Sequence, residues 1–421
     1  MRNNKGITLV ALVVTIVVLL ILAGVSINLV LGENGIVAKT KEAKDKTEQA
    51  QSNELQDFNN ISGEIDEILS DNGSGNGGTG GGSGTDKKVP AEPTEETAPY
   101  YPDGDFKTID GTIDSGLVIA DKNGNEYVWV VVPKSLYNNT AYNSNDEKKP
   151  SSSTDYANIE YCLQQYTATY RNGTKYSDTY VADDKNVGWF ADATAYNNLK
   201  NSMLKSVYEN GGFYVGRYEA GISENRTASS GKATETPVSK ANAYPYNYVT
   251  RTQAKVLAEK IKYTNGDKSY TGSLMFGVQW DLVLAFMHNK GKIDDSKLIT
   301  NSTTIGNYED NLWEIKNANA QYSEDYGDTF TACQNPFKKE SSSDILLTTG
   351  ADSSFSVQNI YDIAGNVYEW TLENTSNTRY PCASKGGWYG ASGSRYGPAV
   401  YLNFKGTDDS GSCFGFRVSL F

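Results

Sequence analysis

One stretch near the N-terminus constrains this chain more than any other feature. Residues 7–31 form an apolar run without a single charged side chain. A helix of about 20 residues crosses the hydrocarbon core of a bilayer, so the run is long enough to span one. Arg2 and Lys5 precede it, and positive residues tend to stay on the cytoplasmic side. We therefore expect a cytoplasmic-membrane anchor, with the remaining chain outside the cell.

Composition divides the remaining chain into a stalk, a linker and a head. Apolar residues recur at steps of three and four over residues 55–69, which predicts an amphipathic helix. The transmembrane and stalk helix is thus expected over residues 7–71. Glycine-rich and then proline-rich sequence predicts a linker over residues 72–104. Residues 105–421 hold all 6 tryptophans and all 4 cysteines and form the predicted head.

Local patterns within the head predict a loop-rich α+β domain. Runs of β-branched and aromatic residues predict strands over Tyr127–Val132 and Gly212–Tyr218. Helical patterns cover Thr250–Ile261 and Val278–Met287. Long polar segments separate these elements, which is typical neither of a helix bundle nor of a parallel-sheet fold.

Charge and rare residue types exclude several functions. The chain has 51 acidic and 38 basic side chains, for a net charge of -13, and no basic run. A nucleic-acid partner is therefore not expected, because binding to phosphates needs a cationic surface. His288 is the only histidine and no CxxC pair occurs, which disfavours a multi-histidine zinc site or a histidine-dependent triad.

The N-terminal sequence KGITLVALVVTIVVLLILAGVSI resembles the start of a type IV prepilin. The resemblance implies a leader over residues 1–6, cleavage after Gly6 by a prepilin peptidase, and methylation of Ile7. It also implies other pilins as partners and a location at the cell surface or a pilus tip. Ala11 stands where most pilins have a glutamate that pairs with a neighbouring subunit, which favours a minor or tip subunit over a major pilin.

Three phrases in the last third of the chain resemble another family. Tyr361–Trp370 (YDIAGNVYEW), Lys385–Gly387 (KGG) and Gly415–Val418 (GFRV) follow one another as in the formylglycine-generating enzymes, also called sulfatase-modifying factors. Gly212–Glu219 (GFYVGRYE) is similar to an earlier strand of that family. The resemblance implies a variant of the C-type lectin fold for the head.

The catalytic residues of that family are not carried over. The two cysteines that bind copper in the enzymes correspond to Ala391 and Tyr396 in this chain. We therefore expect neither a copper site nor catalytic residues. Cys382 and Cys413 lie outside the motif and are a candidate structural disulfide in an exported domain.

The resemblance also implies a calcium loop in YDIAGNVYEW. Asp362 and Glu369 would supply carboxylate oxygens, and Gly365 and Val367 would supply backbone carbonyls. The alternative is a turn in which Asp362 caps the backbone and Trp370 packs in the core. Both interpretations stay open at this stage.

Ligand contacts are expected between the KGG and GFRV phrases, on the segment 388–409. Aromatic residues and arginine dominate binding surfaces, and short polar residues lie among them here. The predicted contact residues are Trp388, Tyr389, Ser392, Ser394, Arg395, Tyr396, Tyr401, Asp408 and Asp409. The layout is similar to the variable segment in targets of diversity-generating retroelements.

The sequence as a whole predicts a surface adhesin. Its membrane-anchored, non-catalytic, lectin-like head would bind an unknown glycan or protein ligand. Two alternatives remain open: an exported enzyme on the same fold, and a structural minor pilin.

Overall fold

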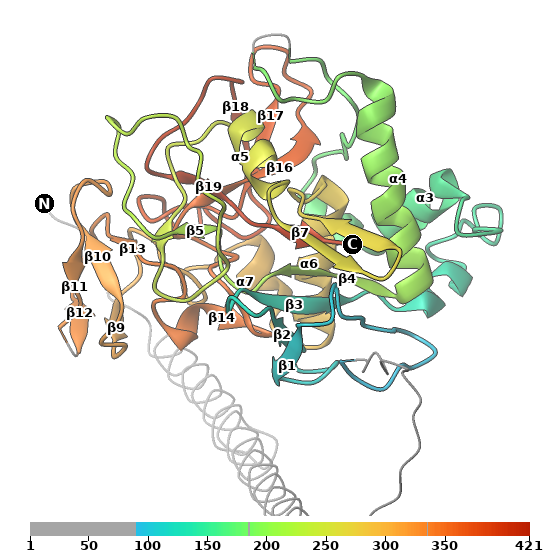
Figure 1. The fold of residues 1–421 in the computed structure, drawn as a ribbon, viewed down its shortest axis with the longest axis horizontal. Coiled ribbons are helices and arrows are strands. Elements are labelled where there is room, and N and C mark those ends of the chain that lie inside the picture. The colour runs from blue at the N-terminus through green and yellow to red at the C-terminus, as the bar shows by residue number, and fades with distance from the viewer. Residues whose placement is uncertain (1–89, 184–185, 335) are drawn as a thin grey trace, which may run out of the picture. The chain divides into compact units, whose positions relative to one another are not determined.

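The computed structural model describes residues 90–183, 186–334 and 336–421 (Figure 1). They belong to a compact unit that runs from Asp86 to Phe421. This unit mixes α-helices and β-strands, and it has few helices.

The prediction of a membrane-anchored chain is corrected by the structure. Among the described residues, no helix is long and apolar enough to cross a membrane. The apolar helix α6 (Gly277–Asn289) has 13 residues, and at about 1.5 Å per residue it falls short of a hydrocarbon core of roughly 30 Å. The structure thus supports neither a transmembrane helix in the fold class nor membrane localisation. The leader (1–6), its site at Gly6 and Ile7, and the helix over 7–71 lie outside the described residues.

A five-stranded antiparallel sheet joins the two ends of the domain. Its strands, in spatial order, are β1 (Lys107–Asp110), β2 (Val118–Ala120), β3 (Glu126–Val131), β4 (Gly212–Gly216) and β20 (Ser419–Leu420). The β-branched run of β3 is buried on both faces, and Trp129 lies opposite Tyr214 of β4. The last strand of the chain therefore completes a sheet that the first strands begin.

A four-stranded sheet contains parts of the three motifs that lie in the last third of the chain. Its spatial order is β18 (Leu402–Lys405), β17 (Cys382–Lys385), β16 (Tyr368–Asn374) and β19 (Phe414–Phe416). The pair β16–β19 is parallel, whereas the other pairs are antiparallel. All residues of β16 are buried, including its two glutamates, so each of these carboxylates needs a partner inside the domain.

In the described part of the chain, the sheets are accompanied by five α-helices: α3 (Tyr156–Tyr166), α4 (Ala193–Asn210), α5 (Arg251–Ala258), α6 (Gly277–Asn289) and α7 (Asp295–Ile299). Short 3-10 helices cover Lys134–Asn138, Ala168–Arg171 and Ser353–Phe355. Helix α5 begins at a capping box, because Thr250 and Gln253 exchange side-chain to backbone hydrogen bonds. Helix α6 is capped from a distant loop, since the Asp178 carboxylate accepts from the backbone N–H groups of Gly277 and Val278 at 2.7 and 3.0 Å.

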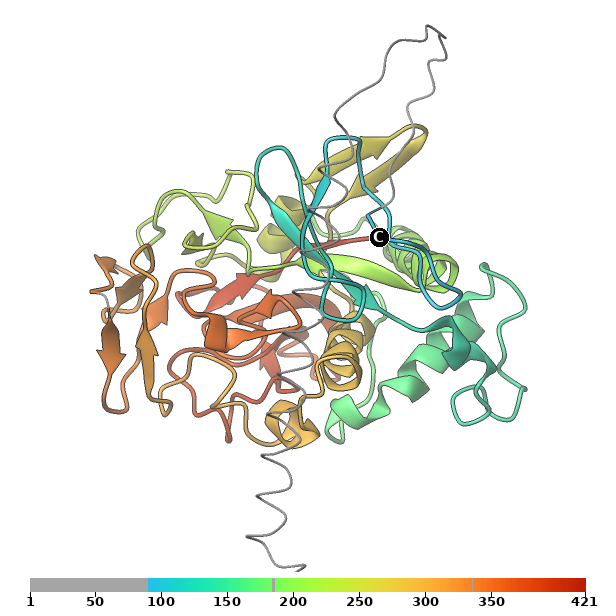
Figure 2. The ribbon, with the colours of Figure 1, turned by 90° about the horizontal axis from the view of Figure 1, so that it is seen from below.

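Short strand pairs complete the domain. They are β5 (Gly221–Ile222) with β6 (Tyr244–Pro245), β7 (Lys262–Asn265) with β8 (Lys268–Thr271), β9 (Trp313–Ile315) with β12 (Phe337–Lys339), and β14 (Ser356–Val357) with β15 (Ile360–Tyr361). A three-stranded sheet has β10 (Gln321–Ser323) between β11 (Thr331–Ala332) and β13 (Leu346–Leu347). The strands β9–β12 lie on the side of the domain opposite α3 and α4 (Figures 1 and 2).

Part of the predicted linker belongs to the domain. The compact unit begins at Asp86, and Thr97 is buried within it. The Thr97 hydroxyl donates to the carbonyl of Gly211 at 2.8 Å and accepts from the indole N–H of Trp129 at 2.8 Å. The described part of the proline-rich stretch therefore packs on the core and is not a free spacer.

Candidate functional site

The segment between KGG and GFRV is a loop followed by strand β18. It leaves β17 at Lys385 through Gly386 and Gly387, whose φ angles are 91° and 82°. A Cβ at Gly387 would lie 2.5 Å from the carbonyl oxygen of Gly397, so only glycine fits this turn. The KGG phrase thus begins a loop over residues 386–401 that returns to the sheet as β18.

Buried groups hold this loop in place. The Tyr308 hydroxyl donates to the carbonyl of Gly386 at 3.2 Å and also contacts the carbonyl of Gly397, which joins the two arms of the loop. The indole N–H of Trp280 donates to the carbonyl of Ala399 at 2.9 Å. The Ser302 hydroxyl accepts from the backbone N–H of Ala399, also at 2.9 Å. The loop therefore has a fixed backbone on a buried support.

Tyr389 is part of that support. Its side chain is fully buried, and its hydroxyl hydrogen-bonds the hydroxyl of Ser412 at 2.9 Å. Its backbone N–H donates to the carbonyl of Asn366 at 2.9 Å. The prediction that Tyr389 contacts a ligand is wrong, because the ring packs against Leu346 and Val367 in a small core cluster.

Four predicted contact residues form one surface, which we call the aromatic face: Trp388, Arg395, Tyr396 and Tyr401. Tyr396 keeps 50% of its surface exposed, and the guanidinium of Arg395 lies 5.2 Å from the centre of its ring. The ring of Tyr401 meets that of Tyr396 edge-on at 6.2 Å between centres. Trp388 and Tyr401 are half-buried and flank Tyr368, whose hydroxyl donates to the carbonyl of Tyr396 at 3.0 Å.

Polar groups lie beside the aromatic face. The Ser392 hydroxyl donates to the carboxylate of Asp310 at 2.6 Å, and the backbone N–H of Gly393 donates to the same carboxylate at 3.1 Å. The hydroxyls of Ser392 and Ser394 hydrogen-bond at 3.0 Å. Asp310 comes from a distant segment, so the sequence offered no local pattern by which to place it here.

Asp408 and Asp409 are separated from the aromatic face. They follow β18, whose last residue, Lys405, pairs with Cys382 at the far end of β17. The four residues of β18 span about 13 Å at 3.3 Å per residue. The Asp409 carboxylate accepts from the backbone N–H of Gly406 at 2.8 Å and stabilises a turn there. The prediction of one continuous surface over 388–409 is therefore wrong for its second half.

The four cysteines are free thiols, which corrects the predicted disulfide. The carbonyl of Cys413 accepts from the backbone N–H of Tyr368 at the start of β16, whereas Cys382 pairs with Asn374 at its end. A seven-residue strand at about 3.3 Å per residue separates them. Disulfides need Cα atoms within about 7 Å, so these two thiols cannot meet.

The loop predicted to bind calcium is held by an arginine. The Arg417 guanidinium contacts both oxygens of Glu369, with its Nε 3.1 Å from each and its Nη2 2.6 Å from Oε1. One oxygen of Asp362 accepts from the backbone N–H of Gly350 at 2.8 Å. The backbone N–H groups of Gly365 and Val367 donate to the carbonyl of Gly386 and to the carboxylate of Glu219.

These contacts do not fit a calcium ion at Asp362 and Glu369, because a cation already occupies the oxygens of Glu369. Among residues 90–183, 186–334 and 336–421, no group of three or more histidine, cysteine, aspartate or glutamate side chains is placed to hold a metal ion. Of the two interpretations of this loop, the capped turn describes the contacts, and Trp370 packs in the core.

Three buried carboxyls share the charge of Arg417. Burial raises the pKa of Glu219 well above its usual value, and the nearby carboxyls of Asp362 and Glu369 add to the shift. Burial also raises the pKa of Asp362 to about 7. The pKa of Glu369 is raised by burial against the opposing effect of Arg417. Glu219 lies inside the GFYVGRYE motif, but no local sequence pattern indicates its partners.

Lys385 of the KGG phrase belongs to a second buried ionic group. Its ammonium lies 3.4 Å from the carboxylate of Asp281 and 3.7 Å from that of Glu373. Arg171 pairs with the same two carboxylates, 3.1 Å from Asp281. Two cations thus balance two anions between α6, β16 and β17, which indicates that Lys385 is part of the framework and not a contact residue.

The positions of Ala391 and Tyr396 also have no cysteine next to them in the sequence. The single histidine, His288, lies at the end of α6, and its Nδ1 is 3.0 Å from the carboxylate of Asp295.

Compared with protein-family models, with curated proteins and with solved structures, the chain matches none of them. The candidate function therefore depends on the geometry of the site.

Proposed function

We propose that the unit Asp86–Phe421 is a non-catalytic ligand-binding domain and that the aromatic face contacts its ligand, a glycan or a protein surface. One observation carries the proposal. Arg395 and Tyr396 are exposed on a loop whose backbone is fixed from below by buried groups. A loop whose backbone is already fixed loses less conformational entropy when it binds, so the face is prepared for a partner.

The chemistry of the face suits recognition. Tyrosine and tryptophan supply rigid contact area with polar edges, and arginine adds a planar group of donors. The Asp310 carboxylate and the hydroxyls of Ser392 and Ser394 add hydrogen-bonding groups beside the rings. Ala391 and Tyr396, which stand where the resemblance to formylglycine-generating enzymes expects cysteines, support a domain without that chemistry.

The test is binding of the full-length protein to an array of glycans and cell-surface proteins. The double variant Arg395→Ala/Tyr396→Ala should lose about 2 kcal/mol or more of binding free energy if both residues are central contacts. Its melting temperature should stay close to that of the wild type, because both side chains are exposed.

Exposed residues away from the face provide the control. Tyr326 keeps 57% of its surface exposed, and Tyr326→Ala should leave binding unchanged. Retention of full binding by the double variant would remove the aromatic face from the proposal.

A further inference from the structure

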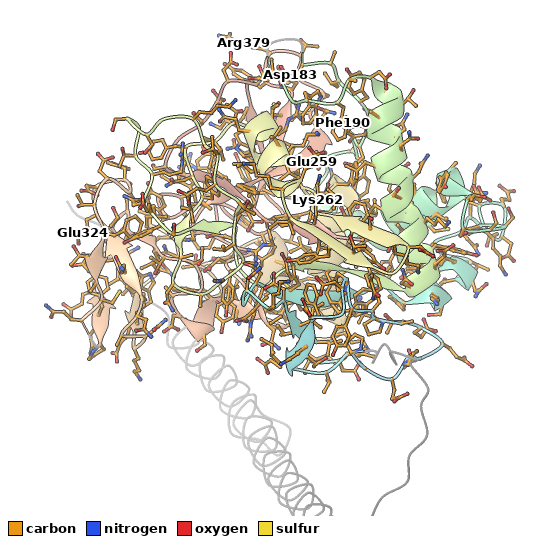
Figure 3. All side chains as sticks on the ribbon, viewed as in Figure 1. Asp183, Phe190, Glu259, Lys262, Glu324 and Arg379 are labelled. Atoms are coloured by element: carbon orange, nitrogen blue, oxygen red, sulfur yellow. The ribbon has the colours of Figure 1, made fainter. Side chains whose placement is uncertain are left out.

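A polar cleft lies at the end of the four-stranded sheet away from the aromatic face. It forms where β16 ends, β17 begins and β18 ends, and its volume of about 370 Å³ falls in the range of roughly 300–1,000 Å³ that is usual for small-molecule sites. The lining residues are Val181, Ala182, Asp183, Thr375, Asn377, Thr378, Arg379, Pro381 and Thr407. Figure 3 shows Asp183 and Arg379 near each other at this edge of the domain.

The β16–β17 loop forms one wall of the cleft and is held by its own hydrogen bonds. The side-chain oxygen of Asn377 accepts from the backbone N–H groups of Arg379 and Tyr380 at 2.9 and 3.2 Å. The backbone N–H of Thr375 donates to the carbonyl of Pro381 at 3.0 Å and closes the loop. The amide NH₂ of Asn377 and the guanidinium of Arg379 are not used in these bonds.

Asp183 forms the facing wall, and its carboxylate is oriented by two donors. The Thr252 hydroxyl, at the start of α5, donates to it at 3.1 Å. The side-chain amide of Asn186 donates to the same carboxylate at 3.1 Å and to the carbonyl of Thr407 at 3.1 Å. Oδ2 of Asp183 accepts from both donors, whereas Oδ1 accepts only from Asn186, at 3.3 Å, and keeps a lone pair for a hydroxyl donor.

The two walls carry opposite charges that do not neutralise each other. Within the described part of the chain, no acidic side chain lies within ion-pairing distance of Arg379, which stacks 5.3 Å from the ring centre of Tyr380. A guanidinium binds a carboxylate through two parallel hydrogen bonds. Val181, which lines the cleft, keeps 36% of its surface exposed and offers apolar contact.

We propose that this cleft binds a polyhydroxylated carboxylate of the size of one hexuronic acid unit. Arg379 pairs with the carboxylate of the ligand, and Asp183, Asn377 and Thr378 hydrogen-bond its hydroxyls. A phosphate is disfavoured, because its second charge would be repelled by Asp183. The cleft and the aromatic face share no residues, so an experiment can rule out one site without ruling out the other.

The experiment is a titration of the full-length protein with sodium glucuronate, followed by ligand-observed NMR and calorimetry. Arg379→Gln should weaken glucuronate binding roughly tenfold or more, as expected for a lost charge-assisted pair. Lys149→Gln removes an equal charge from an exposed position elsewhere and should leave binding unchanged. Because Arg379 is exposed, neither variant should alter the melting temperature.

Two further ligands test the contributions of the carboxylate and of the hydroxyls separately. Glucose lacks the carboxylate and should bind more weakly, with no difference between wild type and Arg379→Gln. Acetate keeps the carboxylate but lacks the hydroxyls and should also bind more weakly. The proposal is overturned if glucuronate does not bind saturably, if Arg379→Gln binds it as the wild type does, or if acetate binds equally well.

Discussion

Two tyrosines of the same loop have opposite surroundings. Tyr389 is fully buried, whereas Tyr396 keeps half of its surface exposed. Replacing Tyr389 with alanine removes a packed ring, so the free energy of unfolding should fall by about 3–5 kcal/mol. Tyr396→Ala should change it by no more than about 0.5 kcal/mol. Urea denaturation of both full-length variants measures the difference, and equal losses would contradict the exposed position of Tyr396.

Alanine substitutions at Gly387 and Gly173 distinguish the cost of backbone strain from the cost of steric contact. Both have a left-handed φ, 82° and 80°, but a Cβ at Gly387 would lie 2.5 Å from the carbonyl oxygen of Gly397, whereas Gly173 faces open space. Alanine at Gly173 should cost about 1–2 kcal/mol of folding free energy from the backbone alone. Alanine at Gly387 should cost clearly more, because the loop must also move. Chemical denaturation of both variants checks this, and a smaller loss at Gly387 would count against the described turn.

Elements with a strong local pattern could be predicted from the sequence. The predicted strand Tyr127–Val132 is β3 shifted by one residue, and the predicted helices contain α5 and most of α6. Their β-branched run, capping box and apolar stretch each act over a few residues. Helix α4 was not predicted, because its sequence is polar and its burial comes from tertiary contacts such as the hydrogen bond from the Tyr196 hydroxyl to the carbonyl of Leu372.

The candidate site could be predicted only where its residues share one loop. Trp388, Arg395, Tyr396 and Tyr401 come together because the loop over 386–401 leaves and re-enters one end of the sheet. Strand β18 then separates them from Asp408 and Asp409, and no sequence pattern marked that strand. Arg417 could not be linked to Glu369 either, since their contact depends on the parallel pairing of β16 with β19.

The pair of Glu369 and Arg417 connects two sheets. Arg417 follows β19, binds Glu369 of β16, and donates to the carbonyl of Gly216 in β4 at 2.9 Å. Glu369→Gln should leave this buried guanidinium without its counter-charge, which costs about 3–5 kcal/mol. Glu209→Gln breaks an exposed pair with Lys205 and should cost about 0.3–0.5 kcal/mol. Thermal and urea unfolding measure both variants.

The effect of calcium on the melting temperature distinguishes the Glu369–Arg417 ion pair from a calcium-binding loop. Because Arg417 already holds Glu369, the wild-type melting temperature should be the same in calcium and in chelator. A calcium-dependent rise that disappears in Glu369→Gln would show instead that the ion displaces the arginine.

At the scale of the whole molecule, buried carboxyls link stability to pH. Burial raises the pKa of Asp178 to about 7, with Glu373 adding to the shift, and it raises that of Asp362 to about 7 as well. The pKa of Glu219 is raised in the same direction. Near pH 6 the folded domain therefore holds protons on these groups that the unfolded chain, with ordinary carboxyl pKa values, has already released.

The sign of the pH dependence follows from this difference in bound protons. A folded state that holds more protons than the unfolded state loses stability as pH rises, by up to about 1.4 kcal/mol per pH unit for each such group. The stabilisation from Asp178 and Asp362 should be complete below about pH 4 and lost as pH passes about 7. At the acidic end, hydrogen bonds lower the pKa of Asp325 to about 2, so the stabilisation from this group is lost progressively as pH falls from about 4 to about 2.

Full-length protein should consequently be more stable in urea at pH 5 than at pH 8. Asp362→Asn keeps an acceptor for the backbone N–H of Gly350 at 2.8 Å but removes the titrating proton, so this variant should lose part of the slope between pH 5 and 8. Asp408→Asn changes an exposed carboxyl and should keep the wild-type slope. If stability instead rises from pH 5 to 8, Asp178 and Asp362 are ionised in the folded protein. The attraction of cationic partners then exceeds the free-energy cost of burying the two charges.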